Sequence, residues 1–170
     1  MTGHLRISKR TRVGEVHGRL DIEPVVVGVD EDLISAARRP MAQPGTRLLA
    51  VVDAEGRLVG VLPVLRLVEE IVARVSPEEL MAEVTDLESA GRFGREVGAH
   101  VCRDLMGPPV HLTLDSTVAD AFRAMHEHQY SGLPVVDDQM QVVGYVDLLE
   151  LALRYLDQLP ASSAPEALPS

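Results

Sequence analysis

The chain has 170 residues, a formal net charge of −10 and a hydrophobic content of 46%. This hydrophobic content can supply a packed core, and the acidic balance disfavours general binding to nucleic-acid phosphates. Aromatic residues make up only 3%, so we expect an aliphatic core and little surface for base stacking. The single cysteine, Cys102, cannot form an internal disulfide. The sequence has neither the apolar region of a secretory signal nor a stretch of about 18 apolar residues, so we expect a cytoplasmic protein without membrane insertion.

The first 11 residues form a basic arm that contrasts with the acidic remainder of the chain. Arg6, Lys9 and Arg10 lie within it, and Arg12 follows directly. Such a run is typically a solvated surface segment, and the alternative is a contact for an acidic partner. At the other end, residues 158–170 are rich in Pro, Ala and Ser and are predicted to be a disordered tail.

Two segments of the chain are close copies of each other. Residues 51–60 read VVDAEGRLVG and residues 135–144 read VVDDQMQVVG, an offset of 84 residues from 51 to 135. Upstream, VGVDEDLISAA (27–37) matches LTLDSTVADAF (112–122) with the offset increased by one residue. Such self-similarity indicates a duplicated structural unit.

The first copy is assigned to residues 12–75. Pro40 is expected to end or kink its first helix early, because proline removes an N–H and clashes with the preceding turn. Glu55-Gly56 marks the turn of a hairpin. The predicted elements are a strand, a helix, a hairpin and a closing helix, at 25–29, about 31–41, 48–53 with 58–62, and onward to about 75.

The second copy is assigned to residues 107–157 and has the same order of elements. Asp115 and Ser116 are predicted to cap its first helix, since their side-chain oxygens accept from free N–H groups of the first turn. Its apolar face is formed by Val118, Ala121, Phe122 and Met125. The other elements are strands at 110–114, 133–136 and 142–146 and a closing helix at 147–156. The unit is β-α-β-β-α, so the predicted fold class is α/β (α+β), with two tandem repeats.

Residues 76–106 are predicted to be a helical linker between the copies. Ser76-Pro77-Glu78-Glu79 has the pattern of a capping box with proline at the first helical position. The helix carries further acidic residues at Glu83, Asp86 and Glu88. They are typical of a solvated helix face, and the alternative is cation binding between acidic faces.

These features resemble the CBS-domain pair, also called a Bateman module. The resemblance spans about Arg12 to Leu156 and is carried by LLAVVDAEGRLVGVL in the first copy and by RDLM, DSTVADAFRAM, SGLPVVDD and VVGYVDLLEL around the second. It implies that the repeats pack about a pseudo-twofold axis and that two pairs form a homodimer. It also implies a non-catalytic sensor that binds an adenosine-type ligand, such as AMP, ADP, ATP or S-adenosylmethionine, and regulates a separate enzyme or transporter.

The family's nucleotide motif is a glycine, two residues, a serine or threonine, two more residues and an aspartate. In the second copy, Gly144 is followed by Asp147 and Glu150 at these positions. Glu150 can accept from ribose hydroxyls, whereas Asp147 can cap a helix but repels a phosphate. In the first copy, Pro63 and Arg66 stand there and offer neither group. One altered site therefore remains, which favours a ligand with little or no phosphate, a bridging metal or no ligand.

The base pocket of such modules is lined by the strand after the lead-in and by the loop into the second strand. In this chain the corresponding residues are Val110, Leu112, Tyr130, Gly132, Leu133, Pro134 and Val135. Several of them are core positions whether or not a ligand binds. Together with Asp147 and Glu150 they form the candidate binding site, and we predict no catalytic residue and no metal ligand.

Two other sites are predicted to be structural, and the role of a third is left open. His126 and His128 are two positions apart, so in a helix they point in different directions and form a solvated helix end, not a metal site. Cys102 is expected to be a buried or half-buried structural thiol. His111 lies near the candidate cleft, either as a ligand contact or as a half-exposed strand residue.

Three functional hypotheses follow from the sequence. The first is a sensor that binds an adenosine-type ligand between its repeats and modulates a separate partner. The second is a module that dimerises and binds a partner without any small ligand. The third is a pair that responds to Mg²⁺ and is linked to transport. An enzyme is the least favoured class because no nucleophile–base pair is visible.

Overall fold

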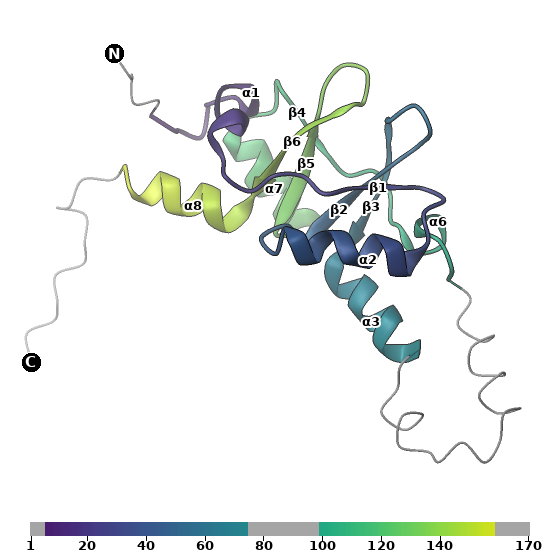
Figure 1. The fold of residues 1–170 in the computed structure, drawn as a ribbon. Coiled ribbons are helices and arrows are strands. Elements are labelled where there is room, and N and C mark those ends of the chain that lie inside the picture. The colour runs from purple at the N-terminus through teal and green to yellow at the C-terminus, as the bar shows by residue number, and fades with distance from the viewer. Residues whose placement is uncertain (1–5, 75–98, 159–170) are drawn as a thin grey trace, which may run out of the picture.

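The computed structural model describes residues 6–74 and 99–158. Two three-stranded sheets lie side by side at the centre of the molecule, each with its own helices (Figure 1). The first repeat comprises β1 (Val26–Gly28), α2 (Leu33–Ala42), β2 (Leu48–Val52), β3 (Leu58–Pro63) and α3 (Val64–Arg74). The second comprises β4 (Leu112–Thr113), α7 (Val118–His128), β5 (Gly132–Val136), β6 (Val142–Asp147) and α8 (Leu148–Leu156). The predicted β-α-β-β-α unit and its duplication are confirmed.

Both sheets have the same topology and register. β1 runs parallel to β2, and β2 runs antiparallel to β3; β4, β5 and β6 repeat this arrangement. Val51 pairs with Gly60, and the equivalent Val135 pairs with Gly144. The central strands are continuous apolar runs because both of their faces are covered, and β5 is buried along its whole length.

The two hairpins meet on the pseudo-twofold axis that relates the repeats. Arg57 forms an antiparallel bridge with Gln141, its own equivalent at the offset of 84 residues. The preceding turn residues, Gly56 and Met140, are also equivalent, and both adopt positive φ, at 80° and 62°. Apolar side chains from both repeats form a shared buried cluster there, made of Ala50, Leu58 and Val136. The predicted pseudo-twofold packing is thereby confirmed.

A short helix precedes each repeat and packs against the other repeat. These two lead-in helices are α1 (Val13–Val16), which is followed by the 3-10 turn His17–Arg19, and α6 (Cys102–Leu105). The N–H of Val13 donates to the carbonyl of Ser116, beyond β4, at 2.7 Å. The N–H of Arg103 donates to the carbonyl of Val29, beyond β1, at 2.8 Å. The lead-in helices are therefore exchanged between the repeats.

The basic arm contacts the second repeat through its backbone. The carbonyl of Lys9 accepts from the N–H of Ala119 at 3.1 Å, and that of Thr11 accepts from Val118 at 2.9 Å. Both donors belong to the first turn of α7, where helical N–H groups lack partners within the helix. Ile7 is buried in the core of the second repeat. The arm therefore completes a helix end while its basic side chains stay exposed.

The cap of α7 differs from the prediction. Thr117 occupies the cap: its hydroxyl accepts from the N–H of Asp120 at 3.1 Å, and the Asp120 carboxylate accepts from the N–H of Thr117 at 2.9 Å. The hydrogen bond from the Thr117 backbone lowers the pKa of Asp120. Asp115 and Ser116 were the wrong choice because a turn separates β4 from the helix. The side chain of Asp115 is exposed and forms an ion pair with Arg12.

Two further details differ from expectation. Pro40 does not end α2, which continues to Ala42, although α2 is one residue shorter than α7, with 10 residues against 11. The proline lies in the last turn, where the loss of one backbone donor costs little, and its ring is buried. The strand predicted at 110–114 is limited to Leu112–Thr113. Most of the predicted linker 76–106, including its acidic residues, and nearly all of the predicted tail 158–170 lie outside the described residues.

Candidate ligand-binding site of the second repeat

The candidate site is built around the junction of β6 and α8. Asp147 ends β6, pairs with Gly132 of β5 and is the N-cap of α8. Its carboxylate accepts from the N–H of Glu150 at 3.0 Å, and the residue is 5% exposed. The structure thus brings three predicted site residues, Gly132, Asp147 and Glu150, together at one end of the sheet. Asp147 acts there as a helix cap, the role that its carboxylate was expected to perform.

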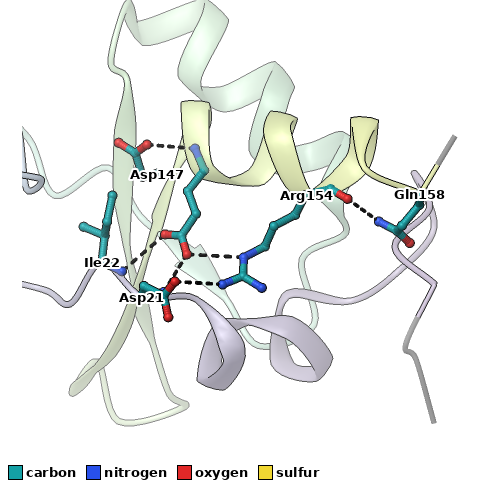
Figure 2. Close-up of polar contacts among 6 residues, drawn as sticks. Asp21, Ile22, Asp147, Arg154 and Gln158 are labelled. Atoms are coloured by element: carbon teal, nitrogen blue, oxygen red, sulfur yellow. Dashed lines mark hydrogen bonds and ion pairs between the residues drawn. The ribbon is translucent and has the colours of Figure 1, made fainter. Parts of the chain in front are cut away.

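The carboxylate of Glu150 is already engaged within the chain. Its two oxygens accept from the backbone N–H groups of Asp21, at 2.5 Å, and Ile22, at 3.2 Å (Figure 2). Arg154, one turn further along α8, approaches the same carboxylate at 3.4 Å and the carboxylate of Asp21 at 3.1 Å. The segment before β1 of the first repeat is therefore bound to the carboxylate that was predicted to accept from a ribose.

The apolar candidates divide into half-buried residues and fully buried residues. Val110 and Tyr130 are half-buried. The Tyr130 hydroxyl lies 3.6 Å from the position of a Cβ built on Gly107, which pairs with Val61 of β3. Tyr130 thus faces the first repeat. The remaining candidates are fully packed in the sheet and its core, namely Leu112, Gly132, Leu133, Pro134 and Val135.

Tyr145 was not among the site residues predicted from the sequence. It lies in the middle of β6, is 1% exposed, and its hydroxyl accepts from the N–H of Arg47 at 3.4 Å. Burial raises its pKa to about 12, so the phenol stays protonated. A Cβ added at Gly132 would overlap the Tyr145 hydroxyl. A comparison of the two repeats could have identified it. The residues of the first repeat that are equivalent to Gly132 and Tyr145 are Leu48 and Val61, so the larger side chain is on the first strand of the hairpin in one repeat and on the second strand in the other.

The first repeat offers different chemistry at the equivalent junction. Pro63 ends β3 and Arg66 is exposed in the first turn of α3. The N–H of Val64 donates to the carbonyl of Arg47 at 2.9 Å. The equivalent bond, from the N–H of Leu148 to the carbonyl of Ser131 at 2.8 Å, is present in the second repeat as well, so what the first repeat lacks is the side-chain cap that Asp147 provides. Neither Pro63 nor Arg66 offers a carboxylate to a ribose.

Cys102 is buried and His126 and His128 are exposed, as the sequence predicts. Cys102 is fully buried and burial raises its pKa to about 11, which leaves an unreactive thiol. His126 and His128 are exposed at the end of α7, and His128 stacks on Tyr130 with ring centroids 6.1 Å apart. His111 is half-exposed, with Nδ1 2.7 Å from the carbonyl of Pro109.

A pocket of about 210 Å³ lies away from the candidate site, between the arm and α8. It is lined by Arg6, Ile7, Ser8, Tyr155 and Gln158. Among residues 6–74 and 99–158, no group of three or more His, Cys, Asp or Glu side chains is arranged to hold a metal ion. In the same part of the chain, no helix has both the length and the apolar character needed to cross a membrane.

Known proteins match both the sequence and the fold. The curated relatives are much longer than this chain: an uncharacterised protein of Methanocaldococcus jannaschii is 28% identical over 158 residues, which is 91% of this chain but 34% of the relative. Among solved structures, a CBS domain-containing protein from Thermotoga maritima has a TM-score of 0.67 at 22% identity, covering 89% of this chain and 99% of that one.

Two similar structures contain adenosine-type ligands. The CBS domain pair of protein MJ0100, in complex with 5′-methylthioadenosine and S-adenosyl-L-methionine, has a TM-score of 0.62 at 19% identity and covers 88% and 98% of the two chains. CBSX2 in complex with AMP has a TM-score of 0.61 at 22% identity and covers 86% and 97%. The model of the CBS domain matches residues 13–73 and 102–157, more than half of the sequence. The chain therefore belongs to the CBS domain family and carries two copies of that domain in tandem.

Proposed function

We propose that this chain is a non-catalytic regulatory module whose second repeat binds an adenosine-type ligand and thereby modulates a separate partner. The observation that carries the proposal is Glu150, a carboxylate that accepts two hydrogen bonds at the first turn of α8. Glu150 stands where the family motif has its ribose-binding aspartate. Similar CBS pairs bind AMP, S-adenosylmethionine or 5′-methylthioadenosine, which supports the ligand class.

The charges around the site favour a ligand without a phosphate. Three carboxylates, of Asp21, Asp147 and Glu150, lie near the start of α8, and the guanidinium of Arg154 pairs with two of them. The Asp147 carboxylate also occupies the helix N-terminus, where a phosphate would otherwise find free N–H donors. We therefore expect 5′-methylthioadenosine and S-adenosylmethionine to bind more tightly than AMP or ATP.

Ligand binding is expected to raise the thermal stability of the protein. At 100 times its Kd, a ligand that binds only the native state stabilises by about 2.7 kcal/mol, or about 5–10 °C in Tm for a chain of this size. A thermal-shift series with 5′-methylthioadenosine, S-adenosylmethionine, AMP, ATP, NAD and Mg²⁺ measures this. Glu150→Ala should abolish the ligand-induced shift, whereas Glu127→Ala, at an exposed position of α7, should leave it unchanged.

The same series distinguishes the alternatives. A shift that survives Glu150→Ala would move the ligand away from α8 and contradict the site assignment. Stabilisation by Mg²⁺ alone would favour the ion-responsive module. If no adenosine compound changes the Tm, the hypothesis of an adenosine sensor is wrong, and a module that binds a partner without a small ligand becomes the favoured alternative.

A second function, self-association, is supported by the closing helices. Each has an exposed apolar stripe, formed by Leu65, Val68 and Val72 on α3 and by Leu149, Leu153 and Leu156 on α8. Leu65 and Leu149 are equivalent in the two repeats, as are Val72 and Leu156. Since the pseudo-twofold axis relates the two stripes, a second copy of the chain could cover both at once. We propose that these stripes form the interface of a homodimer.

Charges placed on the stripes should dissociate this dimer. The double variant Leu65→Glu/Leu149→Glu buries like charges at the contact and is expected to shift the protein from dimer to monomer at micromolar concentration. Sedimentation equilibrium measures the change. Met41→Glu is the matched control, because Met41 is 81% exposed on α2 and outside both stripes. A wild-type monomer, or a dimer that persists in the double variant, would show that the stripes are not the interface.

A further inference from the structure

The connection that leads into β1 is longer than its counterpart before β4. Val16 and Leu105 are the last residues of the lead-in helices, and Val27 and Leu112 are equivalent in strand register. Ten residues (17–26) separate the first two, and only six (106–111) separate the second two. The first repeat therefore has four additional residues in this connection. The duplication alone gives no reason for them.

The longer connection delivers two backbone donors to Glu150. The N–H groups of Asp21 and Ile22 both bond to its carboxylate, and Arg154 bonds to the carboxylates of both Asp21 and Glu150 (Figure 2). In the first repeat, Arg66 stands at the position equivalent to Glu150 and cannot accept such donors. The extra residues of the first repeat's connection therefore lie against the second repeat, which is the repeat that has a carboxylate to bind them.

The same segment also fills apolar space. The side chain of Ile22 packs against the core cluster of the second repeat. It lies 3.2 Å from the position of a Cβ built on Gly45. The carbonyl of Glu23 accepts from the Thr46 hydroxyl at 2.7 Å, which ties the segment to the start of β2. An apolar group next to two donors on one carboxylate is the pattern that a nucleoside would present, with its base and its ribose diol.

We propose that residues 20–23, the plug segment, occupy the second-repeat site as an internal competitor that an adenosine-type ligand must displace. The proposal rests on the function proposed above. A ribose diol would donate to Glu150 in place of the Asp21 and Ile22 N–H groups. Because the plug segment leads directly into β1 and is bonded to Thr46, its release would alter the edge of the first repeat. Ligand binding in one repeat would thereby be transmitted to the other.

Weakening the plug segment should strengthen ligand binding. Ile22→Ala removes its apolar contact and leaves Glu150 intact. When only a fraction of the protein is competent to bind, the apparent Kd equals the intrinsic Kd divided by that fraction. We therefore expect about tenfold tighter binding of 5′-methylthioadenosine in this variant. Isothermal titration calorimetry measures the affinity. Ile34→Ala, at an exposed isoleucine of α2, is the matched control and should not change it.

Amide hydrogen exchange tests the displacement directly in the unaltered protein. Saturation with 5′-methylthioadenosine should accelerate exchange of the Asp21 and Ile22 amides, although a bound ligand ordinarily slows exchange around its site. In the absence of ligand, Glu150→Gln should also accelerate these two amides, whereas Glu127→Gln should not.

The possible outcomes separate the two proposals. In one outcome, 5′-methylthioadenosine binds, but the affinity of Ile22→Ala and the exchange rates of the two amides are unchanged. The plug segment is then a fixed part of the structure, and the proposal of an internal competitor is wrong while the proposed function stands. If no adenosine compound binds to either the wild type or Ile22→Ala, the proposed function is overturned, and the competitor with it.

Discussion

Replacing Gly132 with alanine is expected to destabilise the protein by about 3 kcal/mol, since overpacking a dense core costs this much when the neighbours cannot move. The new Cβ would overlap the hydroxyl and ring of Tyr145, which is 1% exposed and held on all sides. Urea denaturation followed by circular dichroism measures the loss. Gly18→Ala is the control, because a Cβ at Gly18 would meet no atom within 4 Å. Equal stability of the two variants would contradict a close contact between Gly132 and Tyr145.

The first repeat indicates how this loss can be reversed. There, Leu48 stands at the position of Gly132 and Val61 at that of Tyr145. The double variant Gly132→Ala/Tyr145→Val should therefore be more stable than the sum of the single changes predicts, with a favourable coupling of about 2 kcal/mol. Tyr145→Val alone should cost about 3 kcal/mol through the cavity that it leaves. Strict additivity of the two changes would show that Gly132 and Tyr145 do not constrain each other.

Deleting residues 1–11 is expected to lower the free energy of unfolding by about 4 kcal/mol. The deletion removes two carbonyls that accept from the first turn of α7, at about 1 kcal/mol each, and the buried side chain of Ile7, at about 2 kcal/mol. Urea denaturation of the shortened chain measures the effect. This size of loss would make the arm part of the second repeat in energetic terms, although it lies at the opposite end of the sequence.

A variant without the charges distinguishes the contribution of the arm's backbone to stability from that of its basic side chains. Lys9→Gln/Arg10→Gln keeps the carbonyls and Ile7 while it removes two exposed positive charges. Exposed charges contribute little to stability, so we expect a change of less than about 0.5 kcal/mol. A loss as large as that of the deletion would instead assign the stability to the charges, in conflict with the observed backbone contacts.

The repeat and its elements could be predicted from the sequence because they depend on side-chain patterns. Val51 and Val135 lie in apolar runs, and Gly60 and Gly144 end matching segments, so the strands and their order were visible. The exchange of the lead-in helices was not visible. It is made by backbone hydrogen bonds, such as that from Val13 to Ser116, and any sequence can form those.

The candidate site was predictable only in part. The family frame selected Asp147 and Glu150, and the structure puts both at the start of α8. The partner of Glu150 could not be found by the same reasoning, because Asp21 and Ile22 contribute main-chain N–H groups and not their side chains. Tyr145 was not predicted because a residue inside an apolar strand is ordinarily assigned to the core. Its side chain is nevertheless much larger than that of Val61, the equivalent residue of the first repeat.

The exchanged lead-in helices also bear on the order in which a nascent chain can fold. The first repeat is completed by α6, so the carbonyls of Val29 and Glu31, which follow β1, lack their partners until residue 103 has been synthesised. The first lead-in helix, made earliest, finds its bonding partners only around residues 114–116. Contacts between such distant residues slow folding, because long loops must close before any packing is gained. We therefore expect the two repeats to assemble together after most of the chain has left the ribosome, and neither to be a stable early intermediate.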